Sequence, residues 1–284
     1  MPTLLALLAS AAATAGCGGS DREPPDEPPA ELLAGALSDP PSSGNVRIDA
    51  AAELDGDSLL AGEAGAELEG PFAAAARAEL PRFALGLDGE LAGFGVDGEL
   101  VSTGDDAFVV FFGENYRVGP ERTAEAAARW GAVAAETGAL APAVPSWFRS
   151  PRYAGAEDVA GTETQRIEAG LDGARAGRDI AAVARAAGAP SLFEALAAGA
   201  RDGSAEAWVA FEDRSLRRLR IEFPFRIPAA ARVGALGIAS GTAELDVQLS
   251  DLGEAVEIER PEGGGFQPIE QLTGRLRSLA GLAL

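Results

Sequence analysis

The residue with the clearest chemical role is Cys17, the only cysteine in the chain. It ends the string Thr14-Ala15-Gly16-Cys17, which follows an apolar stretch that begins at Leu4 and contains no charge. Small residues before a lone cysteine, behind an apolar segment, are typical of a bacterial lipoprotein signal. The chemistry would be cleavage before Cys17 and attachment of a lipid to its thiol, which would hold the mature protein on a membrane.

Other interpretations of the first residues fit less well. The apolar stretch is too short to span a bilayer, which needs about 20 apolar residues. An ordinary cleaved signal or an apolar tail would leave the position of Cys17 unexplained, although residues 1–16 lack the usual Lys or Arg. The sequence therefore predicts a lipoprotein signal peptide at 1–16. It places the mature chain on the extracytoplasmic side of the cell membrane, in the periplasm or cell-wall space.

A solvated spacer is predicted after the cysteine. Residues 18–30 read GGSDREPPDEPPA and contain no large apolar side chain. Such segments stay extended in water. We expect 17–30 to carry the lipid and act as a disordered linker, and 31–284 to form one folded domain. Because a single cysteine cannot form a disulfide within the chain, the domain depends on its apolar core.

The residue types that are missing exclude most catalytic chemistry. The chain has no His, and its 23 cationic residues are all Arg against 44 Asp and Glu, for a net charge of −21. This composition excludes Ser-His-Asp and Cys-His catalysis, His-based zinc sites, the P-loop lysine and Schiff bases. A carboxylate pair of the glycosidase type is possible in principle, but nothing singles one out. We expect no enzyme activity, no metal, no cofactor and no nucleic-acid partner.

One glycine motif matches a nucleotide-binding pattern but lacks the strand and helix that such a site needs. Residues 93–98 match G-x-G-x-x-G, which binds a dinucleotide only after a strand and at the start of a helix. Here Asp88-Gly89 and Asp97-Gly98 read as hairpin-turn dipeptides, and no helical period follows. We interpret the motif as turn and bend glycines.

The remaining pattern alternates between strands and short helices. Helices are predicted at 31–37, 121–137, 178–188, 190–200 and 268–284. Residues 45–118 read as strands and turns, and the apolar run Ala107–Phe112 predicts a central strand covered on both sides. A Pro-broken loop at 139–152 reads as exposed and aromatic because it carries Trp147 and Phe148.

Half-buried antiparallel strands are predicted at 162–171, 217–226 and 241–251, where apolar residues alternate with polar ones. The order of elements predicts an α+β fold with one extensive antiparallel sheet. The few predicted helices are short and rich in Ala, so their side chains cover the apolar face of the sheet only thinly. Either the helices pack closely on the sheet, or an apolar cavity remains between the two.

Four segments carry a resemblance to a known family. They are 107–118, with a strand and an aromatic-Tyr hairpin, 146–171, with a Trp loop before a Val-x-Gly-x-Glu-Thr turn, 207–221, and 245–261, with a Ser-Asp-x-Gly turn. Together with the signal they resemble the LppX/LprAFG group of actinobacterial lipid-carrier lipoproteins, which share the LolA-like half-barrel fold. The resemblance implies a single curved antiparallel sheet with helices covering its concave face.

The same resemblance implies that the protein binds a lipid or glycolipid in an apolar cavity and carries it across the cell envelope. An envelope transport protein is a candidate partner. Two residues are expected at the mouth of the cavity, Trp147 and Phe148. Eight are expected to line it: Phe83, Leu85, Phe94, Leu219, Ile221, Phe223, Leu245 and Val247. Inward alternation fits a packed core equally well. The alternatives are an RseB-like sensor and a structural envelope lipoprotein, both acting through protein contacts.

Overall fold

The computed structural model describes residues 23–57, 61–75, 79–91, 93–140, 143–186, 188, 191–232 and 237–282. Cys17 and the predicted signal peptide lie outside these residues. Within them the chain forms five α-helices, two short 3-10 helices and one 12-stranded sheet. The sheet is antiparallel except where its last, two-residue strand pairs in parallel. The predicted α+β fold with one large curved antiparallel sheet is therefore confirmed.

The strands form two consecutive runs that meet in the middle of the sheet. The spatial order is β12-β6-β5-β4-β3-β2-β1-β11-β10-β9-β8-β7. The bounds are β1 (Ser43–Gly56), β2 (Gly62–Ala73), β3 (Arg82–Leu91), β4 (Phe94–Ser102), β5 (Ala107–Phe111), β6 (Glu114–Arg117), β7 (Phe148–Val159), β8 (Thr162–Leu171), β9 (Gly203–Ala210), β10 (Leu216–Arg226), β11 (Ile238–Ser250) and β12 (Gln267–Pro268). The pairing of β1 with β11 joins the two runs into one layer.

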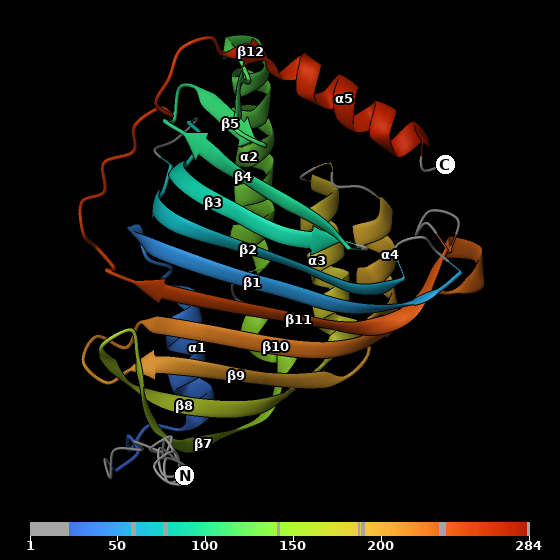
Figure 1. Ribbon diagram of the computed structural model, residues 1–284. Helices are drawn as coiled ribbons and strands as arrows, with labels where there is room; N and C mark the ends of the chain where they lie inside the picture. The colour runs from blue at the N-terminus through green and yellow to red at the C-terminus, as the bar shows by residue number, and fades with distance from the viewer. Residues whose placement is uncertain are drawn as a thin grey trace, which may run out of the picture.

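Four helices lie on one face of this layer, and a fifth lies at its β6 end (Figure 1). The helices are α1 (Pro29–Ser38), α2 (Pro120–Leu140), α3 (Gly173–Ala186), α4 (Ser191–Gly199) and α5 (Ile269–Leu282); the 3-10 turns are η1 (Val144–Trp147) and η2 (Ala229–Ala231). None of the helices in the described ranges is both long and apolar enough to cross a membrane. All five predicted helices are found. The α3 helix starts earlier than predicted because Asp172 caps it, accepting a hydrogen bond from the Arg175 backbone N–H.

The strand register separates an apolar face from a charged face. We call the side that carries α1 to α4 the inner face, and the opposite side the outer face. One inner row runs across five strands: Leu219, Val247, Ile48, Leu68 and Leu87. The neighbouring outer row is Arg220, Asp246, Asp49, Glu67 and Asp88. Because side chains alternate between faces along a strand, this period of two makes the inner face apolar and the outer face charged.

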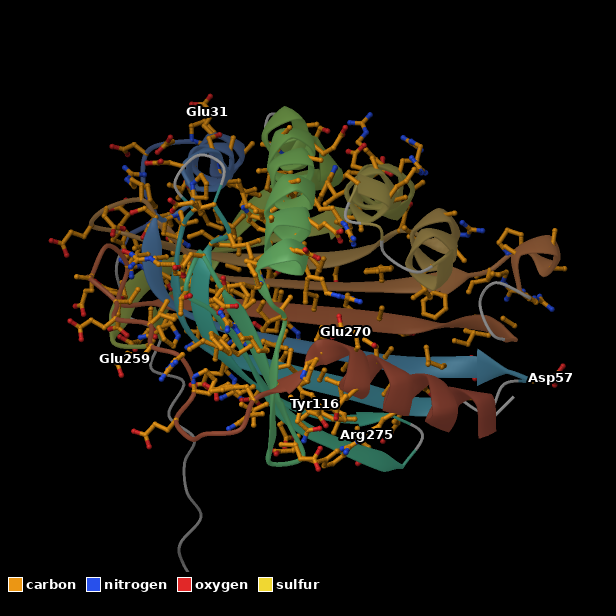
Figure 2. All side chains as sticks on the ribbon, turned by 90° about the horizontal axis from the view of Figure 1, so that it is seen from above. Glu31, Asp57, Tyr116, Glu259, Glu270 and Arg275 are labelled. Atoms are coloured by element: carbon orange, nitrogen blue, oxygen red, sulfur yellow. The ribbon has the colours of Figure 1, made fainter. Side chains whose placement is uncertain are left out.

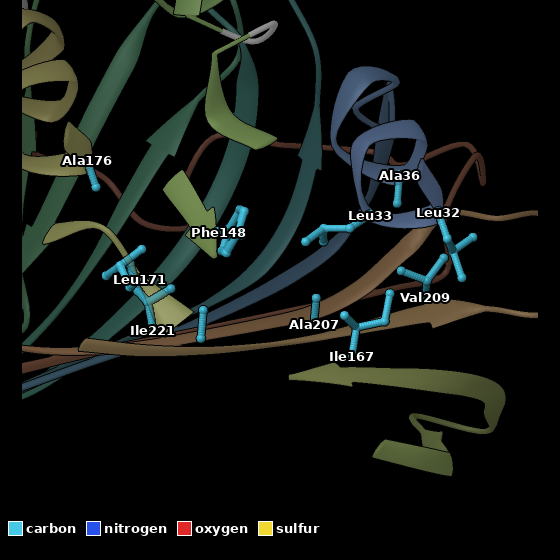
Figure 3. Close-up of a cluster of buried hydrophobic side chains, with 11 residues drawn as sticks. Leu32, Leu33, Ala36, Phe148, Ile167, Leu171, Ala176, Ala207, Val209 and Ile221 are labelled. Carbon is cyan, nitrogen blue, oxygen red and sulfur yellow. The ribbon is translucent and has the colours of Figure 1, made fainter. Parts of the chain in front are cut away.

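The main core lies beneath α1. Leu32, Leu33 and Ala36 of this helix are buried against Ile167 of β8 and Val209 of β9. Figure 3 shows these side chains together at one end of the cluster, with Ala176, Leu171 and Ile221 at the other end. The segment before the helix is also fixed, because Arg214 forms an ion pair of 2.7 Å with Glu27.

Two glycines bring α3 into backbone contact with its neighbours. A Cβ added at Gly177 would lie 2.0 Å from the carbonyl oxygen of Ala197 in α4, and one at Gly173 would lie 1.7 Å from that of Arg201. No real side chain tolerates such distances. The α3–α4 pair therefore keeps its close packing only while both positions remain glycine.

The two predicted Asp-Gly turns are wrong. Asp88 and Asp97 pair with each other inside the β3–β4 hairpin, and the chain reverses between Leu91 and Phe94 instead. Gly89 and Gly98 allow close strand packing, since their added Cβ atoms would lie 2.9 Å and 2.7 Å from backbone oxygens of neighbouring strands. The G-x-G-x-x-G string thus spans a strand reversal and β4, not a helix start.

The strand predicted at Ala107–Phe112 is present, but its predicted position at the centre of the sheet is wrong. It forms β5, which lies near the sheet edge between β4 and the short β6. Its outer side chain Phe108 is buried, with its ring centroid 5.2 Å from that of Phe266. Phe112 lies beyond the strand and is 63% exposed, so the apolar run is covered only in part.

The β7 edge of the sheet is irregular. Its pairing with β8 shifts register twice, around Pro151 and around Gly155. Ser150 and Gly155 both have positive φ, of 50° and 110°. Tyr153, between them, donates a hydrogen bond from its hydroxyl to the Glu27 backbone oxygen. These features break the row of free backbone groups that an edge strand otherwise presents.

The α5 helix is attached to β6 by its first two turns. Ile269 and Leu272 are buried against Tyr116. Figure 2 shows Tyr116 and Arg275 near each other at this contact, and both interact with the Glu114 carboxylate. The Tyr116 hydroxyl and the Arg275 guanidinium hold the pKa of Glu114 below its usual value of 4.5.

We predict opposite effects of the same substitution at two helical glycines. Gly177→Ala should destabilise the protein by about 1–3 kcal/mol, because the new methyl group meets the α4 backbone. Gly131→Ala in α2 has nothing within 4 Å of the added atom and should stabilise by up to about 1 kcal/mol. Urea denaturation measures both. Equal effects at the two sites would contradict the close α3–α4 contact.

A second prediction concerns pH and the attachment of α5. Because the folded state lowers the pKa of Glu114, its contribution to stability is complete above 4.5 and is lost as the pH falls below that value. Hydrogen exchange of the α5 amides, corrected for intrinsic rates, should show protection decreasing over this range. Glu114→Gln should remove the pH dependence. Unchanged pH dependence in that variant would show that Glu114 is not responsible.

Candidate functional site

An apolar pocket lies between the α3–α4 pair and the inner face of the sheet. Its volume is about 170 Å³. The lining comes from the end of β8, from both helices, and from β10 and β11: Leu171, Gly173, Ala176, Gly177, Ile180, Leu196, Ala197, Ala200, Ile221, Phe223, Phe225 and Ala243. Every lining side chain is apolar, so the pocket offers hydrocarbon contact and no side-chain hydrogen bond.

The depth of the pocket follows from the exposure of its lining. Leu171 and Phe225 are 1% and 2% exposed, and they belong to the closed interior. Ile180 on α3 is 38% exposed although it lines the same pocket. Water can therefore reach the pocket past Ile180, which marks its mouth. A chain entering there would exchange water for apolar contact at about 25 cal/mol per Å².

The inner face is not covered evenly. Beneath α1 it is filled by the core cluster, whereas Ala50 of β1 and its partner Ala66 of β2 are exposed. Among the elements in the described ranges, α2 packs mainly along α3. Thus both expected arrangements occur in one sheet: close packing beneath α1, and an apolar pocket beneath α3 and α4, while the face towards β1 and β2 is open.

Two of the ten predicted ligand residues line the pocket, Ile221 and Phe223. Leu219 and Leu245 lie on the same inner face and pack against the core cluster. Val247 also points to the inner face, where it pairs with Leu219 and Ile48. The predicted face of β10 and β11 is therefore correct, but only part of it reaches the pocket.

The predicted mouth residues lie elsewhere. Phe148 is 8% exposed and begins β7, where it belongs to the core cluster. Trp147 ends η1 and donates a hydrogen bond of 2.7 Å from its indole nitrogen to Asp179 of α3. The prediction of an exposed aromatic loop is wrong because strand pairing with Leu171 draws Phe148 into the interior.

The remaining predicted residues belong to the other run of strands. Phe83 and Leu85 lie on β3, where Phe83 pairs with Phe72 and Leu85 pairs with Leu100. Neither lines the pocket. Phe94 begins β4, and its side chain lies outside the described residues.

The helical wall of the pocket was not predicted from the sequence. Gly173, Ala176 and Gly177 place the α3 backbone beside the cavity, and Ala197 and Ala200 do the same for α4. The Ala-rich helices show no row of large apolar side chains that would have indicated this wall. The Gly-x-x-x-Gly spacing at 173–177, a pattern that allows close helix contact, was the available signal.

Larger hollows occur on the outer face but have a different chemistry. One of about 700 Å³ is lined by Asp49, Glu67, Asp88, Glu90 and Asp97 among others. Ionised carboxylates resist burial against hydrocarbon, so these hollows do not suit an apolar ligand. Across the described part of the chain, no group of three or more acidic, His or Cys residues is arranged to hold a metal ion.

Comparison with known proteins gives matches of structure only. No family model and no curated protein sequence matches the chain. LppX of Mycobacterium tuberculosis is similar at 14% identity, covering 82% of this chain and 100% of LppX, with a TM-score of 0.38. LprF of Mycobacterium bovis is similar at 15% identity, covering 83% and 97%, with a TM-score of 0.43.

A LolA superfamily protein of Nitrosomonas europaea is similar at 11% identity, covering 78% of this chain and 93% of that protein, with a TM-score of 0.22. The resemblance predicted from sequence, to the LppX/LprAFG group and to LolA-like proteins, thus recurs in the comparison of structures. At these identities the likeness concerns the fold.

Proposed function

We propose that the protein is an extracytoplasmic lipoprotein that binds the hydrocarbon part of a lipid or glycolipid and carries it across the cell envelope. The observation that carries the proposal is the pocket under α3 and α4, whose twelve lining residues are all apolar. A void of this kind beneath a partly exposed Ile180 provides burial for a chain that enters from outside. Each buried methylene contributes about 0.8 kcal/mol.

The lining supports binding in preference to catalysis. A reaction needs a nucleophile, an acid or base, or a polar group that stabilises a developing charge near the substrate. The pocket side chains supply none of these. Two charged residues of α3, Arg178 and Asp179, directly precede Ile180 in the sequence, and Asp179 accepts the hydrogen bond from Trp147.

The proposed membrane attachment rests on the Cys17 string and on the acidic Pro/Gly segment at 17–30. Residue Glu27 is held by Tyr153 and by Arg214, just before α1 begins. A lipid on Cys17 would therefore be linked to the α1 end of the domain by about ten residues, a span of at most roughly 35 Å. This arrangement suits a domain that collects a lipid from the bilayer to which it is attached.

We predict that filling the pocket abolishes lipid capture. In Ala243→Phe the added ring would occupy the void, whereas Ala50→Phe adds the same atoms to an exposed position on the same face. Native mass spectrometry of the full chain, purified from a lipid-containing host, should show a bound lipid in the original protein and in Ala50→Phe only. Thermal melting of all three proteins verifies that they fold.

A uniform apo mass, without uptake of offered phospholipids, glycolipids or fatty acids, would contradict the proposal. It would favour a structural lipoprotein or a sensor that acts through protein contacts. Loss of the lipid in both variants would show that it binds elsewhere on the inner face.

A further inference from the structure

The pocket is small for a lipid. Its volume is about 170 Å³. An apolar protein cavity of about 150 Å³ takes up one benzene molecule, which has six carbon atoms. By the same measure this pocket holds about six to eight carbon atoms of a chain. That is a fraction of one acyl chain of a membrane lipid, and it leaves no space for a second chain.

The helical wall that limits this volume is held by backbone contacts. Gly173 and Gly177 place α3 so close to its neighbours that even a methyl group would overlap carbonyl oxygens of Arg201 and Ala197. On the floor, a Cβ at Gly241 would lie 2.7 Å from the ring of Phe225, which is itself 2% exposed. Rotation of side chains cannot open the pocket between α3 and its neighbours, because the blocking atoms at Ala197 and Arg201 belong to the main chain.

The open side is the mouth at Ile180. Since this residue is 38% exposed and the lining carries no polar side chain, a polar head group has no partner inside the pocket. The head must remain in water or in a membrane. Hydrocarbon that does not fit in the void must remain outside with it.

We infer that the protein binds only the methyl-terminal segment of a single hydrocarbon chain, about six to eight carbon atoms, with the rest of the ligand outside the mouth. This inference rests on the proposed function and specifies its ligand. The protein would recognise the end of one chain, and would be indifferent to the head group. Ligands would be single-chain amphiphiles, or larger lipids that present one chain end.

The test is a chain-length series on the full chain with its original sequence. Alkyl carboxylates and alkyl trimethylammonium salts of increasing length compete with a fluorescent fatty acid, below their micelle concentrations and at high salt. The Kd should fall about fourfold for each added methylene, up to about eight carbon atoms, and then level off. The two head groups should give the same Kd within about twofold, because neither contacts the pocket.

A matched pair of variants tests whether the pocket sets the chain length at which the Kd stops falling. Ala243→Leu puts three more carbon atoms into the pocket, so the levelling point should move to chains about three carbons shorter; Ala50→Leu should leave it unchanged. A Kd that keeps falling fourfold per methylene to the longest chains would overturn the inference, and would leave the proposed function standing. A strong preference for one head group would also overturn it. No binding at any length would refute the proposed function itself. The series on the original protein decides the matter even where a variant fails to fold.

Discussion

The close contact between α3 and its neighbours determines the character of the site. Gly173 and Gly177 allow helix backbone to lie directly against the α4 backbone and against Arg201. A helix pair that packs this tightly acts as one rigid unit on the inner face of the sheet. The position of the helical wall then depends on main-chain contacts, and the apolar side chains of β10 and β11 line the space beneath it.

Alternation along single strands was a reliable guide to the fold. β8, β10 and β11 begin and end within a few residues of the predicted ranges, because apolar residues at every second position bury only one face of a sheet. Glycine was the main source of error. At Asp88-Gly89 the glycine permits close approach of β2, but the same dipeptide in another context makes a turn. Nothing local distinguishes the two uses, since the distinction lies in the neighbouring strand.

The sequence predicted which face of the sheet carries the site, but it did not predict which residues line the pocket. Leu219 and Ile221 alternate identically in the sequence, yet only Ile221 lines the void. The difference arises from where α3 and α4 leave space, and apart from the Gly-x-x-x-Gly spacing at 173–177 the small residues of these helices gave no signal of it. Phe148 illustrates the opposite error. Neighbouring prolines suggested a loop, whereas pairing between β7 and β8 buries the ring.

The irregular β7 edge has a consequence for encounters between copies of the protein. An open sheet has two ends where another chain could add a strand, and crowding makes such encounters frequent. At β7 the kinks around Pro151 and Gly155 interrupt the flat template that strand addition requires, and the Glu27 segment occupies part of it. At the opposite end the last strands are short, and α5 begins directly after them. Neither end of the sheet therefore presents a long, regular edge strand to which a second copy could add a strand of its own.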